Sequence, residues 1–216
     1  IYITTMYVLH GTSFENCPSI LKNKKINHIS KTGMLSDEFN PKQIFMSLIY
    51  KNIKKQLENM PFWGGCAFVF SPEILKKYPF YANHIGGFSE TFEEGMMKRE
   101  PEKYACGSGN LKIMPKLSNL KKEIDDYMKH DMNAVTFMHS HEILIGNDIP
   151  LNEYCLGVVV RVSEPQKYKN SKEYKNLMKL TKDCNLFLDI FPWNNQTSFN
   201  LGLDGFIDIV NKNIKQ

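Results

Sequence analysis

The first apolar run of the sequence ends in Tyr7-Val8-Leu9-His10-Gly11-Thr12-Ser13. Its apolar residues predict a β-strand over residues 1–10, and the glycine and hydroxyl residues after them predict a turn. A histidine beside a glycine at the end of a strand can present both an imidazole and unhindered backbone amides to a small amide-bearing ring. The alternative is a tight turn whose histidine faces solvent.

A second informative stretch surrounds Glu142, a lone glutamate in front of the apolar residues 143–145. Its carboxylate is expected where a polar loop meets a buried sheet. Burial and neighbouring hydrogen-bond donors fix such a carboxylate for use as a hydrogen-bond acceptor or as an electrostatic stabiliser. The valine-rich residues 156–162 predict another strand shortly after it.

The rest of the chain predicts strands and helices without regular βαβ alternation, which indicates the α+β fold class. Residues 44–57 have apolar spacing closer to that of a helix, although their first half could be a strand. Ser71 and Pro72 predict the start of a helix, with the serine as its cap. Residues 83–110 are rich in Gly, Glu and Ser and predict a long loop. Strands are also expected over residues 66–70, 135–137, 142–145 and 186–191, and helices over residues 16–24, 118–128, 171–181 and 206–214.

Length and composition indicate one globular domain. The chain has 216 residues, of which 42% are hydrophobic and 12% aromatic, and this is enough for a sizeable core and unlike a disordered chain. The net charge of +4 permits an acidic or nucleotide ligand but does not approach that of a dedicated nucleic-acid binder.

Cysteine usage and hydropathy predict an intracellular protein, cytoplasmic or nuclear, that is neither secreted nor in a membrane. The five cysteines are odd in number and widely spaced, and none forms a Cys-x-x-Cys motif, which favours reduced thiols over a disulfide framework. No apolar run is long enough to span a bilayer, and the first residues lack the pattern of a secretory signal.

Three stretches together resemble the signature blocks of the ADP-ribosyltransferase superfamily, on its PARP and DarT-like side. The segments His10-Gly11-Thr12-Ser13 and Glu142-Ile143-Leu144-Ile145 resemble the first and last blocks, and residues 64–72 resemble the strand that carries the middle aromatic residue. The resemblance implies an α+β fold with a split β-sheet. It implies an NAD-binding core over residues 1–164, and residues 165–216 are then a C-terminal extension packed on the same domain.

The resemblance also implies the roles of several residues toward NAD, the co-substrate. The family breaks the bond between nicotinamide and ribose through an oxocarbenium-like transition state. By this resemblance Glu142 stabilises the cation that develops on the ribose, His10 contacts a ribose hydroxyl, and the backbone of Gly11 pairs with the carboxamide. Thr12 and Ser71 are further expected contacts of NAD.

The sequence departs from the family pattern at two places. The middle tyrosine is replaced by Phe68 or Phe70, whose ring can stack on nicotinamide but cannot donate a hydroxyl hydrogen bond. Ser140, another expected NAD contact, stands two residues before Glu142, where relatives that modify arginine or asparagine have Glu or Gln. The acceptor therefore stays open between protein and nucleic acid.

Two further interpretations accompany this one. His139 and His141 alternate along a strand and could ligate zinc, but no cysteine or aspartate cluster supplies the remaining ligands, so we expect no metal site. The function that we predict is transfer of a single ADP-ribose from NAD to an acceptor, with release of nicotinamide. The alternatives are a non-catalytic module that binds NAD, ADP-ribose or a partner protein, and a structural protein with a vacant cleft.

Overall fold

A computed structural model describes residues 6–27, 44–50, 64–78, 80–83, 141–193 and 198–214. Several predicted features lie outside these residues: most of the loop expected over 83–110, the helix over 118–128 and the strand over 135–137. Ser140 and His139 also lie outside them.

One twisted sheet is the framework of the described residues, with seven strands in the order β5-β6-β3-β1-β4-β8-β9. Neighbouring strands are antiparallel, except that β8 and β9 are parallel. The strands are β1 (Met6–Thr12), β3 (Ile44–Tyr50), β4 (Cys66–Phe70), β5 (Phe80–Asn83), β6 (His141–Ile145), β8 (Cys155–Val162) and β9 (Phe187–Pro192). A separate pair consists of β2 (Lys25–Ile26) and β7 (Ile149–Pro150).

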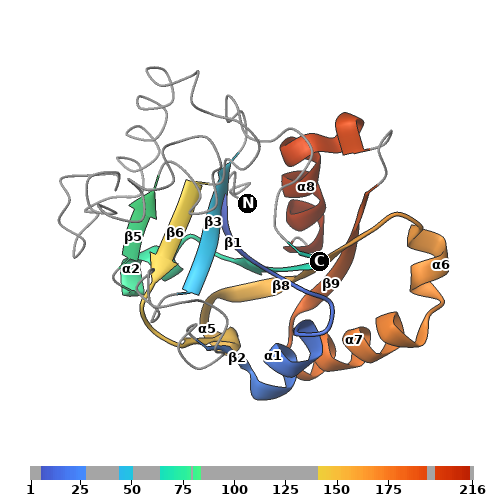
Figure 1. Ribbon diagram of the computed structural model, residues 1–216, viewed down its shortest axis with the longest axis horizontal. Helices are drawn as coiled ribbons and strands as arrows, with labels where there is room; N and C mark the ends of the chain where they lie inside the picture. The colour runs from blue at the N-terminus through green and yellow to red at the C-terminus, as the bar shows by residue number, and fades with distance from the viewer. Residues whose placement is uncertain are drawn as a thin grey trace, which may run out of the picture.

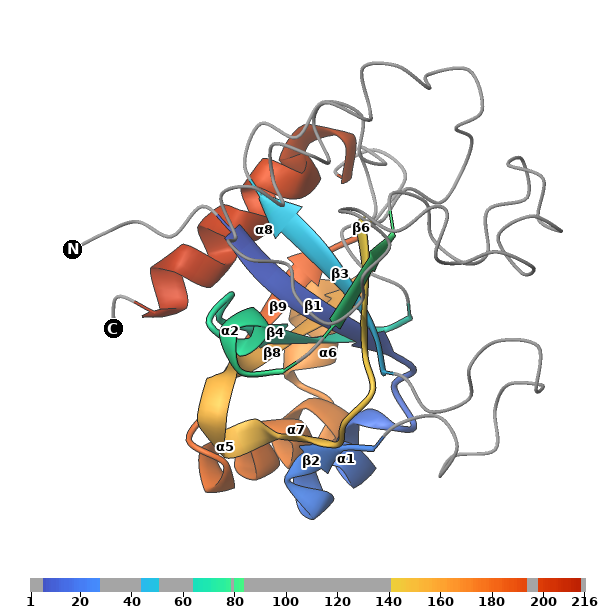
Figure 2. The same ribbon diagram turned by 90° about the vertical axis from the view of Figure 1, so that its left-hand side faces the viewer.

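Helices cover both faces of this sheet, as Figures 1 and 2 show, with α8 on one side and α1 and α7 on the other. This arrangement confirms the α+β class. The helices of the described residues are α1 (Cys17–Asn23), α2 (Ile74–Lys77), α5 (Leu151–Tyr154), α6 (Pro165–Lys169), α7 (Lys172–Asp183) and α8 (Ser198–Ile214).

The alternation of side chains along β1 explains why helices pack on both of its faces. Val8 is wholly buried in the core layer that includes Leu21 of α1 and Leu177 of α7. The neighbouring Leu9 is wholly buried in the other layer, with Phe206 of α8. A strand buried on both faces reads as a continuous apolar run, as residues 6–9 do.

Residues 44–50 form a strand, which was the alternative to the helix that their apolar spacing favoured. β3 lies between β1 and β6, and Leu48, Ile49 and Tyr50 are all buried. Burial on both faces removes the polar alternation that would have marked a strand in the sequence.

The sheet is not divided into two separate sheets, as a split β-sheet would be. β1 is hydrogen-bonded to β3 on one side and to β4 on the other, so the sheet is continuous. Its twist is nevertheless visible: in Figure 1 the strands β5, β6 and β3 run steeply, whereas β8 runs at a much shallower angle. The coarse fold class is therefore established, and the specific family fold is not.

Residues after 164 are part of the same sheet and core. Two helices, α6 and α7, connect β8 to the parallel strand β9, and α8 then packs on the sheet beside β9. Phe206, Ile207 and Val210 of α8 are wholly buried in the layer that contains Tyr7 and Leu9 of β1. The first described strand and the last helix thus share one core layer.

Candidate active site

His10 is held in β1 by a hydrogen bond of 2.9 Å between its Nδ1 and the backbone carbonyl oxygen of Phe45 on β3. A carbonyl oxygen can only accept, so Nδ1 carries the hydrogen. In the neutral ring Nε2 is then the acceptor. The side chain is partly buried, and its ring centroid is 6.5 Å from that of Phe68.

Burial lowers the pKa of His10 below its ordinary value of 6.5, and the hydrogen bond to Phe45 opposes this shift more weakly. Desolvation disfavours the charged imidazolium, so the ring is neutral at neutral pH. A neutral ring with Nδ1 donating to the protein presents Nε2 as an acceptor. A ligand hydroxyl is the kind of group that can donate to it.

Glu142 lies on β6, with one strand between it and β1. Its register partner on β3 is Ser47, and Ser47 pairs with Leu9 on β1. Two interstrand spacings of about 4.8 Å place the backbones of β1 and β6 roughly 10 Å apart at this level. The fold thus brings two segments 132 positions apart in the sequence to neighbouring parts of one sheet.

The register places Glu142 in the row of Leu9, next to the row that contains His10. Adjacent rows of a regular sheet belong to opposite faces. A single ligand can therefore contact both residues only where it reaches past the end of a strand. Glu142 is the second residue of β6 and lies at such an end.

Phe68 and Phe70, expected from the sequence as rings that could stack on nicotinamide, are both wholly buried. Stacking requires an exposed ring face, and here both rings are packed in the core with Val8 and Val158. Phe68 pairs in register with His10, so it supports the position of the histidine from the neighbouring strand.

Gly11 and Thr12 end β1 and are partly exposed. They pair with Ala67 and Cys66 of β4, and the Thr12 carbonyl accepts a hydrogen bond of 2.9 Å from the Gly65 amide. This part of the expected NAD site is therefore ordered by β4 and is not an isolated turn.

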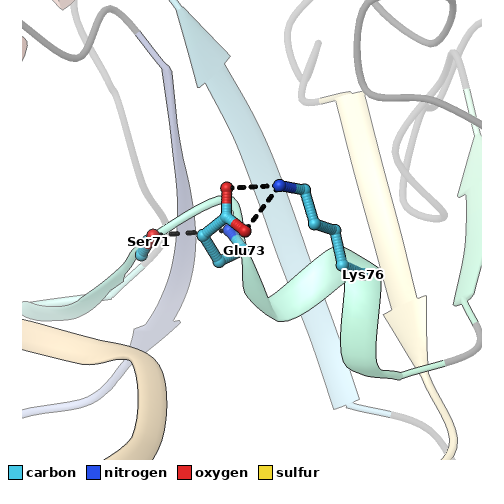
Figure 3. Close-up of polar contacts among 3 residues, drawn as sticks. All are labelled: Ser71, Glu73 and Lys76. Carbon is cyan, nitrogen blue, oxygen red and sulfur yellow. Dashed lines mark hydrogen bonds and ion pairs between the residues drawn. The ribbon is translucent and has the colours of Figure 1, made fainter. Parts of the chain in front are cut away.

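Ser71 lies at the opposite end of β4 from Cys66, three residues beyond the register partner of His10. At about 3.4 Å per residue this separates it from the level of His10 by roughly 10 Å. Its hydroxyl accepts a hydrogen bond of 3.3 Å from the Glu73 amide, beside the Glu73–Lys76 ion pair (Figure 3). The capping prediction was wrong, since the N-cap of α2 is Glu73 and makes no side-chain capping bond.

A residue that the sequence analysis did not single out is Ser47. It is a partly buried polar residue between Leu9 and Glu142 in the register of the sheet. Its only sequence signal was a lone hydroxyl residue within an apolar run.

Within the described residues no group of three or more His, Cys, Asp and Glu side chains is placed to hold a metal ion. Among the helices of this part of the chain, none has the length and apolar character needed to cross a membrane.

Comparison of the sequence with known proteins finds no match: no model of a known protein family matches the chain, and no curated protein sequence does.

Proposed function

We propose that the protein is an NAD-dependent ADP-ribosyltransferase that transfers a single ADP-ribose to a protein or nucleic-acid acceptor. The observation that carries the proposal is the neutral His10 imidazole, anchored through Nδ1 to Phe45 and one strand away from β6 with Glu142. A fixed acceptor nitrogen and a carboxylate-bearing residue are the two elements that the chemistry requires of the protein near the ribose.

In the proposed reaction the bond between the ribose carbon and the nicotinamide nitrogen breaks, and nicotinamide leaves with the bonding electron pair. The cation that develops on the ribose is stabilised by a carboxylate, for which Glu142 is the candidate. The acceptor nucleophile then forms a bond to the same carbon and loses its proton. His10 would hold a ribose hydroxyl through Nε2, which keeps the sugar in place while the bond breaks.

The direct test is to incubate the purified protein with NAD labelled in its adenine part, and to measure free nicotinamide and labelled macromolecules. The wild-type chain should release nicotinamide, and Glu142→Gln should lower the rate about 100-fold or more. The matched control is Glu164→Gln, the same chemical change at an exposed carboxylate paired with Lys167 beyond β8. This control should retain the wild-type rate. Undiminished release by a folded Glu142→Gln variant would refute the proposal.

One observation favours a second candidate, a non-catalytic module of the same fold that binds NAD, ADP-ribose or a partner protein. Neither Phe68 nor Phe70 offers an exposed ring to grip the leaving nicotinamide. Calorimetry would separate the two candidates: heat of NAD binding without any nicotinamide release supports the module, whereas turnover supports the transferase.

A further inference from the structure

A cavity of about 290 Å³ lies between α1, α6, α7 and the end of β8, beside the turn that follows β1. The residues of its lining that matter here are Phe14, Pro18, Tyr168, Glu173, Asn176 and Leu177. Its volume is at the lower end of the range for ligand sites, which suits one planar ring system and is too small for a dinucleotide.

Aromatic and apolar side chains form the walls of this cavity. The rings of Phe14 and Tyr168 are 5.9 Å apart between centroids, and Tyr168 is braced edge-on by Tyr174 at 5.6 Å. Phe14 is nevertheless 37% exposed, which is high for so large an apolar side chain. A flat ring that packs against Phe14 would cover surface that is now in contact with water.

The Phe14 ring packs over a glycine. A Cβ atom on Gly65 would lie 2.2 Å from the Phe14 ring, so the ring packs directly over the Gly65 backbone. Gly65 is itself held by two hydrogen bonds: its amide donates to the Thr12 carbonyl, and its carbonyl accepts from the Arg161 amide. The wall made by Phe14 is therefore attached to the sheet and is not a loose side chain on the surface.

The cavity wall is almost wholly apolar, and two exposed polar residues of the lining, Glu173 and Asn176, add hydrogen-bonding groups. Glu173 and Asn176 are three residues apart on α7, so they lie on the same side of that helix. Glu173 is the one charged residue among the described residues of the lining, and it belongs to none of the ion pairs between described residues. A carboxylate accepts hydrogen bonds only, whereas an amide both donates and accepts. No Lys or Arg stands among the lining residues that the structure describes, and this disfavours a phosphate group.

We propose that this cavity binds a planar heteroaromatic ring with an exocyclic amine, that is, a nucleobase of the adenine type. The ring would pack against Phe14, and its amine would donate to Glu173, with Asn176 pairing with a ring nitrogen. His10 is not among the described residues that line this cavity, and the proposal does not depend on transferase activity.

The test uses ligand-observed NMR with adenosine and with inosine, which carries a carbonyl where adenosine has the amine. Adenosine should bind, and inosine should bind about tenfold more weakly because an accepting carbonyl oxygen replaces the amine that would donate to Glu173. Glu173→Gln should weaken adenosine by a similar factor and reduce the preference over inosine. The matched control is Asp183→Asn, a carboxylate-to-amide change on an exposed residue at the other end of α7, which should have no effect.

The role of the aromatic wall is tested with Phe14→Leu, which keeps an apolar side chain over Gly65 and removes the ring. It should weaken adenosine about fivefold or more while leaving the melting temperature nearly unchanged. Equal binding of adenosine and inosine would overturn the proposal. So would adenosine binding that neither Glu173→Gln nor Phe14→Leu alters. Binding of indole without binding of adenosine would identify a docking site for an apolar partner side chain, and would also overturn it.

Discussion

The Tyr7 hydroxyl donates a buried hydrogen bond of 2.7 Å to the side-chain carbonyl oxygen of Asn211, and this bond joins β1 to α8 across 204 positions of sequence. Asn211 is only 8% exposed, and its side-chain nitrogen is buried with no hydrogen-bond partner among the described residues. The polar contact is thus partly satisfied, in a core layer that is otherwise apolar.

Tyr7→Phe should destabilise the protein by about 1 to 3 kcal/mol, because it leaves the Asn211 amide buried with neither group paired. The double variant Tyr7→Phe with Asn211→Leu should be more stable than Tyr7→Phe alone, since it removes the unpaired amide together with its partner. Urea unfolding of the wild type, both single variants and the double variant gives the coupling energy. Additive single effects would show that the bond contributes nothing to stability.

Gly64 and Gly65 should respond differently to the same substitution. Gly64 has a φ of 82°, and a Cβ there would lie 2.2 Å from the Thr12 carbonyl oxygen, a backbone atom that cannot move away. Gly64→Ala should therefore cost more than about 2 kcal/mol. At Gly65 the three atoms nearest to the new methyl all belong to the Phe14 side chain, which can turn away.

Gly65→Ala should accordingly cost less than Gly64→Ala, while moving Phe14 out of place. Thermal unfolding shows which of the two variants loses more stability. Weaker adenosine binding by Gly65→Ala would report the displacement of the Phe14 ring. A Gly65→Ala variant that is the less stable of the two would contradict the glycine geometry.

The lowered pKa of His10 makes stability depend on pH in a defined direction. In the window between the folded pKa and the ordinary value of 6.5, the unfolded chain binds a proton that the folded protein does not. The contribution of neutral His10 to the free energy of unfolding is fully present above pH 6.5. It is lost as pH falls through that window, by about 1.4 kcal/mol for each pH unit that the window spans. Below the folded pKa the loss is complete.

His10→Asn should make the free energy of unfolding depend less on pH in this window. The asparagine amide can replace the Nδ1 donor to Phe45 and does not titrate. The measurement is urea unfolding of both proteins at about pH 7.5 and about pH 5. The other histidines titrate equally in both proteins, so the difference between the two curves isolates His10. Parallel curves would mean that His10 titrates alike in the folded and unfolded chains.

Elements whose own sequence carries a clear strand or helix pattern were predicted correctly. The valine-rich residues of β8 are one case, and the helix expected over 171–181 is found as Lys172–Asp183, with Ser171 accepting the capping bond from Tyr174. β3 was ambiguous because its two faces are both covered, which no local pattern reveals.

The candidate site was predictable in part. Sequence placed His10 at the end of a strand and Glu142 at the start of another; Glu142 is indeed the second residue of β6, whereas β1 continues two residues beyond His10 to Thr12. It could not supply the Phe45 carbonyl that fixes the tautomer of His10, because that bond depends on the register of two strands 35 residues apart. The same limitation applies to Phe68, which looked like a ligand-stacking ring and is buried because β4 lies between β1 and β8.

Two substitutions of His10 should separate its contact with a ligand from its support of the sheet. His10→Ala removes both the donor to Phe45 and the Nε2 acceptor, so it should lose about 1 to 3 kcal/mol of stability as well as activity. His10→Asn keeps a donor near the position of Nδ1 but has no group at the position of Nε2. If Nε2 holds a ribose hydroxyl, His10→Asn should keep its melting temperature within a few degrees and still release nicotinamide about 100-fold more slowly. If His10 acts only by supporting β1 against β3, His10→Asn should retain most of the activity, and the ligand contact proposed for Nε2 would be withdrawn.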